Sequence, residues 1–241
     1  MTFKEQLQRF GFPGILKVWL KTFHFFDLGH FLWGKPPQAT ADLPLFQLAS
    51  ALLLNMIIAF LAVFRTSIAS PDWGTLTILP LWVLILLGLR NSLMLLVAKI
   101  QALSLRYRLW ETGFVISFIV MLLGGVFVPI PGSYYSKEKV WNSNRIKPQL
   151  GKIALAGSLP TLLISLSLFF LGRFLPLSNN LEIVLATGFR AAFVITVADT
   201  LIPFFPFVSF NGRRLWDWNR WIWGLMAGVI MALWIFLLLG M

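Results

Sequence analysis

Long apolar stretches separated by short polar segments dominate this sequence. Four runs contain no charged residue, and they cover residues 43–64, 112–136, 153–172 and 221–241. Each holds about 20 residues or more, which is enough to cross a hydrocarbon core of about 30 Å as a helix. The pattern therefore predicts an all-α polytopic membrane protein.

The same pattern gives the approximate bounds of each element. We expect five transmembrane helices, at about 44–64, 74–98, 151–172, 182–203 and 221–240. Residues 1–42 mix bulky apolar groups with scattered lysines, which favours an interfacial amphipathic N-terminal segment ahead of a membrane domain at 43–241. Residues 99–111 are amphipathic and are expected at the membrane surface, whereas residues 204–219 are expected to be irregular.

The apolar stretch at about 112–132 is either a sixth span or a re-entrant hairpin. A sixth span would divide the basic loop residues equally between the two sides of the membrane, whereas inserted proteins usually show a bias. A hairpin would leave only Arg65 and Arg173 on one side. Apart from Arg90 and Arg190, which lie inside spans, the other 16 of the 20 Lys and Arg residues would share the opposite side. This bias favours the hairpin.

The hairpin prediction also has a local basis. Gly124, Gly125, Pro129 and Pro131 supply a break in the middle of the stretch. Each arm would then have about ten residues and a length of about 15 Å. The strongly basic side, with the N-terminus, is expected to face the cytoplasm of a cell that holds this protein in its plasma membrane.

Composition narrows the possible functions. The net charge of +11 could indicate a nucleic-acid partner, but the Lys and Arg residues flank apolar spans as membrane anchors do, so no nucleic-acid binding is expected. The absence of cysteine excludes disulfides and thiolate zinc sites. Four tryptophans near the start of the last span are typical of an interfacial aromatic belt, namely Trp216, Trp218, Trp221 and Trp223.

Three segments, in order, resemble the site-2 proteases, which are intramembrane zinc metalloproteases, and most closely their archaeal type. They are GGVFVPIPGSYYSKEK at 124–139, GKIALAG at 151–157 and DTLIPFFPFVSFNGRRLWDWNRWIWG at 199–224. With the span before them, the resemblance covers about residues 75–240. It implies a site-2-protease-like helical core.

In that family, an HExxH motif on one helix supplies two zinc ligands and a catalytic Glu, and a later Asp is the third ligand. The resemblance places these four positions on Arg90, Asn91, Met94 and Asn211, and places a neighbouring family Asn on Thr200. A guanidinium has no lone pair and repels zinc, and Met is a soft, weak ligand. Asn cannot take a proton from water. We therefore expect degenerate zinc-site positions, no metal, no cofactor and no protease activity.

Other residues do not rebuild the site. The two histidines, His24 and His30, both precede the first span. A buried Arg in a span needs a partner, so we expect Arg90 to bond the Asn211 carbonyl or to pair with Asp199; the alternative is that it snorkels to an interface. Arg190 lies nine residues from Asp199, on the opposite helix face. It is expected to meet a lipid phosphate or another subunit, or to snorkel.

These patterns favour a catalytically inactive site-2-protease-like protein that acts as a structural or partner- or client-binding subunit of a membrane complex. Its partners would be the lipid bilayer and one or more transmembrane proteins in a hetero-oligomer. The alternatives are a transporter or channel that uses intramembrane polar residues, and a membrane enzyme with different chemistry.

Overall fold

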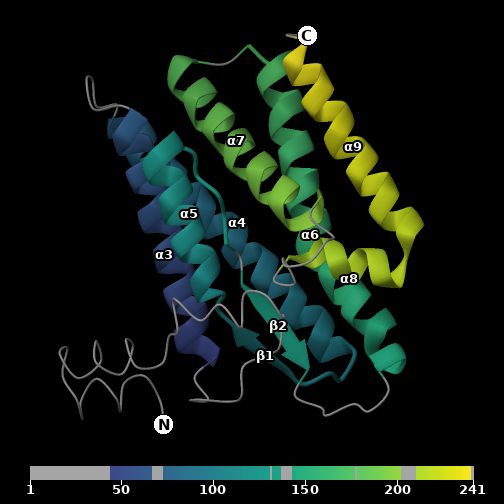
Figure 1. Ribbon diagram of the computed structural model, residues 1–241. Helices are drawn as coiled ribbons and strands as arrows, with labels where there is room; N and C mark the ends of the chain where they lie inside the picture. Colours follow the sequence, from purple (N-terminus) through teal and green to yellow (C-terminus); the bar gives the residue numbers. More distant parts are fainter. Residues whose placement is uncertain are drawn as a thin grey trace, which may run out of the picture.

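The computed structural model describes residues 44–66, 73–130, 132–136, 143–176, 178–201 and 210–239. The N-terminal segment expected at 1–42 lies outside these residues. The described elements, in chain order, are α3 (Pro44–Thr66), α4 (Trp73–Ile100), β1 (Leu105–Arg108), α5 (Glu111–Gly124), β2 (Ser133–Ser136), α6 (Ser143–Phe174), α7 (Asn179–Leu201), α8 (Asn211–Trp218) and α9 (Arg220–Leu238) (Figure 1).

Five helices are long and apolar enough to cross a membrane, namely α3, α4, α6, α7 and α9. The prediction of five transmembrane helices in a polytopic membrane protein is thereby confirmed. One local expectation was wrong, since residues 211–218 form helix α8 instead of an irregular segment. Within this almost entirely helical fold, residues 105–108 form a strand of a small two-stranded sheet, which the sequence pattern did not predict.

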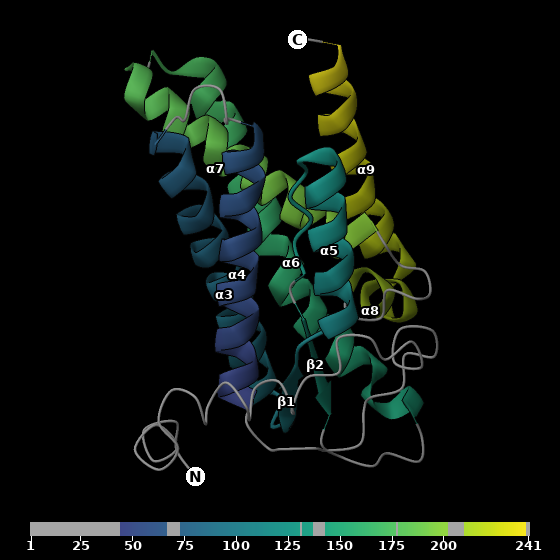
Figure 2. The same ribbon diagram turned by 60° about the vertical axis from the view of Figure 1, so that its left-hand side comes forward.

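The stretch at 112–132 enters and leaves the bundle at the same end. Strands β1 and β2 flank it and pair antiparallel, with Arg108 opposite Ser133. The chain between them must therefore return to its starting level, and Figure 2 shows α5 rising beside α3 before the chain descends again. This confirms the re-entrant hairpin. Its helical arm has 14 residues and is about 21 Å long, deeper than expected.

Side chains satisfy the irregular backbone of the hairpin, as a membrane interior requires. Asn55 on α3 accepts a hydrogen bond from the Ile130 N–H and donates one to the Ile130 carbonyl, each at 2.9 Å. Ser117 donates to the Val128 carbonyl, which ties the two arms together. At the tip, Gly125 has a φ of 67°, and its N–H caps α5 on the Met121 carbonyl.

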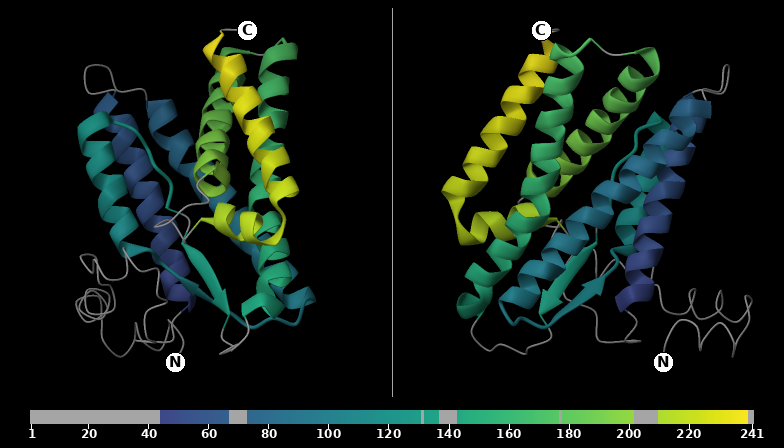
Figure 3. Two further views of the ribbon diagram at one scale, coloured as in Figure 1. Left: turned by 45° about the vertical axis from the view of Figure 1, so that its right-hand side comes forward. Right: turned by 180° about the vertical axis from the view of Figure 1, so that it is seen from behind.

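The centre of the bundle lies where α4, α6 and α7 pack together, with α3 on the outer side of α4 (Figure 3). Close approach is possible because a glycine stands at the α4–α7 contact. A methyl group on Gly188 would lie 2.5 Å from the Trp82 ring, and the same indole donates a 3.1 Å hydrogen bond to the Val184 carbonyl. This packing brings the middle of α4 against the middle of α6, the last turn of α7 and the start of α8, which carry the polar residues described below.

Replacing Asn55 with Ala should destabilise the hairpin, because the Ile130 N–H and carbonyl would lose their partner away from water. The expected loss is about 1–3 kcal/mol in the free energy of unfolding per orphaned group, measured by denaturation in detergent. Thr77→Ala is the control, since Thr77 is exposed and its hydroxyl donates to the Gly74 carbonyl within the first turn of α4. Equal stability of the two variants would contradict the anchoring role of Asn55.

Candidate functional site: a buried ion-pair cluster

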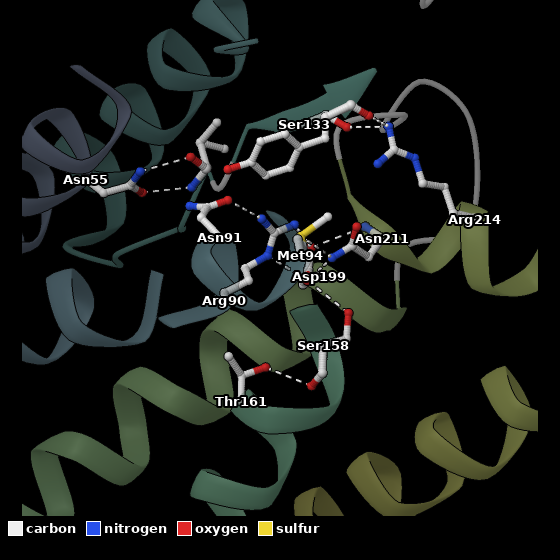
Figure 4. A network of polar contacts seen from close by, with 12 residues as sticks. Asn55, Arg90, Asn91, Met94, Ser133, Ser158, Thr161, Asp199, Asn211 and Arg214 are labelled. Atoms are coloured by element: carbon white, nitrogen blue, oxygen red, sulfur yellow. Dashed lines mark hydrogen bonds and ion pairs between the residues drawn. The ribbon is translucent and has the colours of Figure 1, made fainter. Parts of the chain in front are cut away.

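Arg90 lies in the middle of α4 and is 0 % exposed. Its guanidinium donates two hydrogen bonds to the Asp199 carboxylate of α7, from Nε to Oδ2 at 2.9 Å and from Nη2 to Oδ1 at 2.8 Å (Figure 4). Paired geometry of this kind is the strong form of an Arg–carboxylate contact. The expected pairing of Arg90 with Asp199 is confirmed, and the alternative, snorkelling toward an interface, was wrong because the charge points inward to α7.

Asp199 connects four helices. Besides Arg90 of α4, it accepts hydrogen bonds from the Ser158 hydroxyl of α6 at 2.9 Å. It also accepts from Asn211 of α8, through the backbone N–H at 3.1 Å and the side-chain amide at 2.8 Å. Asn211 is the first residue of α8, and the N–H groups in the first turn of a helix have no partner within the helix. The Asp199 carboxylate accepts a hydrogen bond from one of them. The carboxylate therefore fixes the start of α8 as well as the charge on α4.

Asn91 and Met94 complete the group around the guanidinium. The Asn91 amide oxygen accepts a 3.1 Å bond from Arg90 Nη1. The Met94 sulfur lies 3.6 Å from the Asn211 amide nitrogen, within the range of a weak hydrogen bond. The four positions that the resemblance selects, Arg90, Asn91, Met94 and Asn211, therefore gather at one buried place, together with Asp199.

Two other expected residues stand apart from this group. Arg190 is exposed on α7, away from the cluster. Thr200 is buried beside Asp199, but its carbonyl accepts a 2.8 Å bond from the Trp223 indole of α9, and its hydroxyl has no partner among the described residues. The expected alternative bond from Arg90 to the Asn211 carbonyl is not formed. Arg90 bonds Asp199 and Asn91, and the Asn211 amide oxygen has no partner among the described residues.

Sequence reasoning missed the contributions of Gly157 and Ser158 on α6. A methyl group on Gly157 would lie 2.7 Å from the Met94 sulfur and 2.8 Å from the Asn211 amide nitrogen. Only glycine therefore lets α6 approach the cluster so closely. The signal that could have pointed to Ser158 was a hydroxyl in an apolar span that also carries a glycine, because an intramembrane ion pair needs such donors.

Two tyrosines of the strand pair lie near the guanidinium. The rings of Tyr107 and Tyr134 meet edge to face, with centroids 5.1 Å apart. Burial raises the pKa of Tyr134 to about 12, although the charge on Arg90 opposes the shift, and burial likewise raises the pKa of Tyr107. Both phenols therefore stay neutral at physiological pH and surround the ion pair with low-dielectric material.

Arg214 holds α8 against the strand pair. Its guanidinium donates to the Ser133 hydroxyl at 2.7 Å and to the Tyr134 carbonyl, and it lies 5.6 Å from the centre of the Tyr135 ring. Burial lowers the pKa of this partly buried arginine. The hairpin strands and α8 are thus connected on one side of the cluster, as Figure 4 shows.

Most polar groups of the cluster are bonded to one another. Arg90 has no lone pair for a metal, and the Asp199 oxygens already accept bonds from Arg90, Ser158 and Asn211. No group of three or more His, Cys, Asp or Glu side chains that could hold a metal ion occurs within the part of the chain that the structure describes. Fold and site together define a five-span helical membrane protein with a re-entrant hairpin and a central Arg–Asp pair.

Comparison with known proteins shows a weak similarity to an archaeal protein. A protein of Methanocaldococcus jannaschii whose name reads "Putative zinc metalloprotease" is 26 % identical over 121 residues. The matched region covers 50 % of this chain and 59 % of that relative, so it spans little more than half of the relative's length. No protein-family model matches this chain, and no solved structure matches it.

A mutant cycle measures the strength of the central pair. Arg90→Met should lower the free energy of unfolding by about 3–5 kcal/mol, because it leaves the Asp199 carboxylate buried without a counter-charge. Adding Asp199→Asn should restore part of the loss, so the double variant should be more stable than the sum of the single changes by about 0.5–3 kcal/mol.

Arg190→Met is the matched control, since this arginine lies on α7 but is exposed. Its effect should stay within about 0.5 kcal/mol in the same denaturation measurement. Additive effects of Arg90→Met and Asp199→Asn would show that the two side chains do not stabilise one another.

Proposed function

We propose that this chain is a non-catalytic relative of the site-2 proteases in which an arginine-centred ion pair replaces the zinc, and that it acts as a structural or partner-binding subunit of a membrane complex. The observation that carries the proposal is the position of Arg90. It stands where the resemblance puts the first zinc ligand, and two nitrogens of its guanidinium, Nε and Nη2, bind the Asp199 carboxylate. The match to a relative named as a zinc metalloprotease supports the same ancestry.

The replacement is physically reasonable. A zinc ion bridges helices because its positive charge attracts ligands from each of them. The Arg90 guanidinium supplies a positive charge from α4, and Asp199 spreads the attraction to α6, α7 and α8. The bundle centre would thus keep a charged cross-link without an exchangeable metal.

Protease chemistry has no support from the residues at these positions. Hydrolysis at a metal needs a bound water and a base to deprotonate it. Asn91 stands at the position of the base, and its amide oxygen is occupied by Arg90. Loss of the metal and loss of the base would each abolish the reaction, and this chain combines both changes.

A transport pathway is less well supported. The residues that could line it are Arg90, Asn91, Asp199 and Asn211, and each is at most 2 % exposed. Three of their mutual bonds are charge-assisted and 2.9 Å or shorter. Strong mutual bonds would have to break before these groups could contact water or a solute. The cluster therefore supports a fixed connection between helices better than a transport path.

The proposed subunit role rests on the outer surface of the bundle. Only 22 % of the apolar window of α9 is buried, against 39–44 % for the other four spans. Its free face is therefore available to lipid or to a transmembrane partner. We propose that the protein lies in the plasma membrane with its basic loops in the cytoplasm, because a re-entrant hairpin would leave 16 of the 20 basic residues on one side.

Rebuilding the metal site tests the ancestry. A variant with Arg90→His, Asn91→Glu, Met94→His and Asn211→Asp should bind about one zinc per chain, since it regains two imidazoles on one helix face and a carboxylate on α8. The measurement is elemental analysis after dialysis against trace zinc. The natural chain and a control that lacks only Met94→His should bind much less.

Stoichiometric zinc on the natural chain would overturn the metal-free proposal. A folded four-substitution variant that retains no zinc would show that these positions never formed a site. Thermal unfolding of each variant separates this second outcome from loss of the fold.

Copurification tests the subunit role. The tagged full-length chain, extracted from native membranes in mild detergent, should carry at least one transmembrane protein in fixed stoichiometry through two chromatographic steps. Arg90→Met should lose this partner together with the bundle centre, whereas Arg173→Met, which changes an exposed arginine in the last turn of α6, should keep it. Solute or ion flux through liposomes that contain only this chain would instead favour the transport function.

A further inference from the structure

A groove lies at the C-terminal end of α4, outside the cluster described above. Its volume is about 480 Å³, and it lies between the last turns of α4 and the chain that leads into β1. The walls are largely apolar, and two polar side chains stand among them. The main lining residues are Leu95, Ala98, Leu103, Leu105, Lys99 and Ser104.

The groove lies at the level where lipid headgroups would be found. Helices α4 and α6 pack antiparallel (Figure 3). Gly157 of α6 lies against Met94 of α4, since a methyl group on Gly157 would lie 2.7 Å from the Met94 sulfur. Because each residue advances a helix by about 1.5 Å, five residues further along α4 and five back along α6 bring Lys99 level with Lys152.

Next to Lys152, Gly151 packs on Trp218, since a methyl group there would lie 2.3 Å from the Trp218 side chain. Arg220 then opens α9. Tryptophans and cations at the end of a span mark the membrane–water interface. Lys99 therefore stands at the membrane surface, with Leu95 one helical turn deeper.

The last carbonyl groups of α4 accept hydrogen bonds, so they repel an anion less than unpaired carbonyls at a helix C-terminus would. The Leu103 N–H bonds the Ala98 carbonyl at 2.9 Å, and the Ala102 N–H bonds the Lys99 carbonyl at 3.0 Å. This pair of bonds is a Schellman motif, and Ala102 takes its left-handed position with a φ of 52°. Carbonyls that would otherwise point free at the groove already have donors.

We propose that this groove binds one phospholipid with an anionic headgroup. The Lys99 ammonium, which is exposed and has no ion-pair partner among the described residues, binds the phosphate, and the Ser104 hydroxyl donates to it. The acyl chain lies on the apolar wall that Leu95 and Leu103 form. Charge complementarity favours an anionic lipid, because the chain carries a net charge of +11 and Lys99, Arg106, Arg108, Lys147 and Lys152, among the residues that the structure describes, belong to the segments at this end of the bundle.

The test uses the full-length protein in detergent and native mass spectrometry with added phosphatidylglycerol or phosphatidylcholine. The natural chain should bind its first phosphatidylglycerol about fivefold more tightly than phosphatidylcholine, the contribution of one lysine at a membrane surface. Lys99→Gln should remove that preference. Lys152→Gln, which changes a lysine at the same level but outside the groove, should keep it. Leu95→Trp, which fills the apolar wall, should weaken the binding of both lipids.

Other results would overturn the proposal. An equal loss of preference in Lys99→Gln and Lys152→Gln would mean a general basic belt with no specific site. Unchanged lipid binding by Leu95→Trp would place the lipid elsewhere. Competition by inorganic phosphate as strong as that by phosphatidylglycerol would identify a free-phosphate site. Each variant should unfold at the same temperature as the natural chain without lipid, which shows that the fold is intact.

Discussion

The contact between Arg90 and Asp199 is the constraint on which the rest of this structure depends. Two opposite charges in an apolar bundle are tolerated only if they meet with good geometry and if their remaining groups are bonded. Here the carboxylate accepts five hydrogen bonds from three residues, Arg90, Ser158 and Asn211. That requirement fixes the register of α4 against α7, the approach of α6 and the start of α8.

The re-entrant hairpin obeys a similar rule with neutral groups. Its returning arm runs through the bundle without the internal bonds of a helix, so its backbone needs partners from elsewhere. Asn55 and Ser117 supply them from α3 and α5. Arg214 then connects β2 to α8, and in this way the hairpin and the ion-pair cluster become parts of one assembly.

Much of this arrangement could be predicted from the sequence. Hydrophobic runs locate the five spans because a bilayer sets their length, and the asymmetry of the basic residues favoured the hairpin over a sixth crossing. The partner of Arg90 followed from the cost of an unpaired charge, since few acidic residues lie in spans. The strand at 105–108 could not be predicted, because four residues take up a strand only when β2 is present beside them. The role of Gly157 depends on helix packing, which no local pattern encodes.

The sequence separation of the two charges has a consequence for biogenesis. Arg90 and Asp199 are 109 residues apart, so α4 leaves the ribosome well before α7 exists. At synthesis rates of about 5–20 residues per second, the arginine waits for its counter-ion for roughly 5–20 s. During that interval α4 would hold an unpaired arginine in the bilayer, which is energetically unfavourable. The stable insertion of α4 is therefore a late step of folding. It depends on the insertion of α7 as well as on the hydrophobicity of α4.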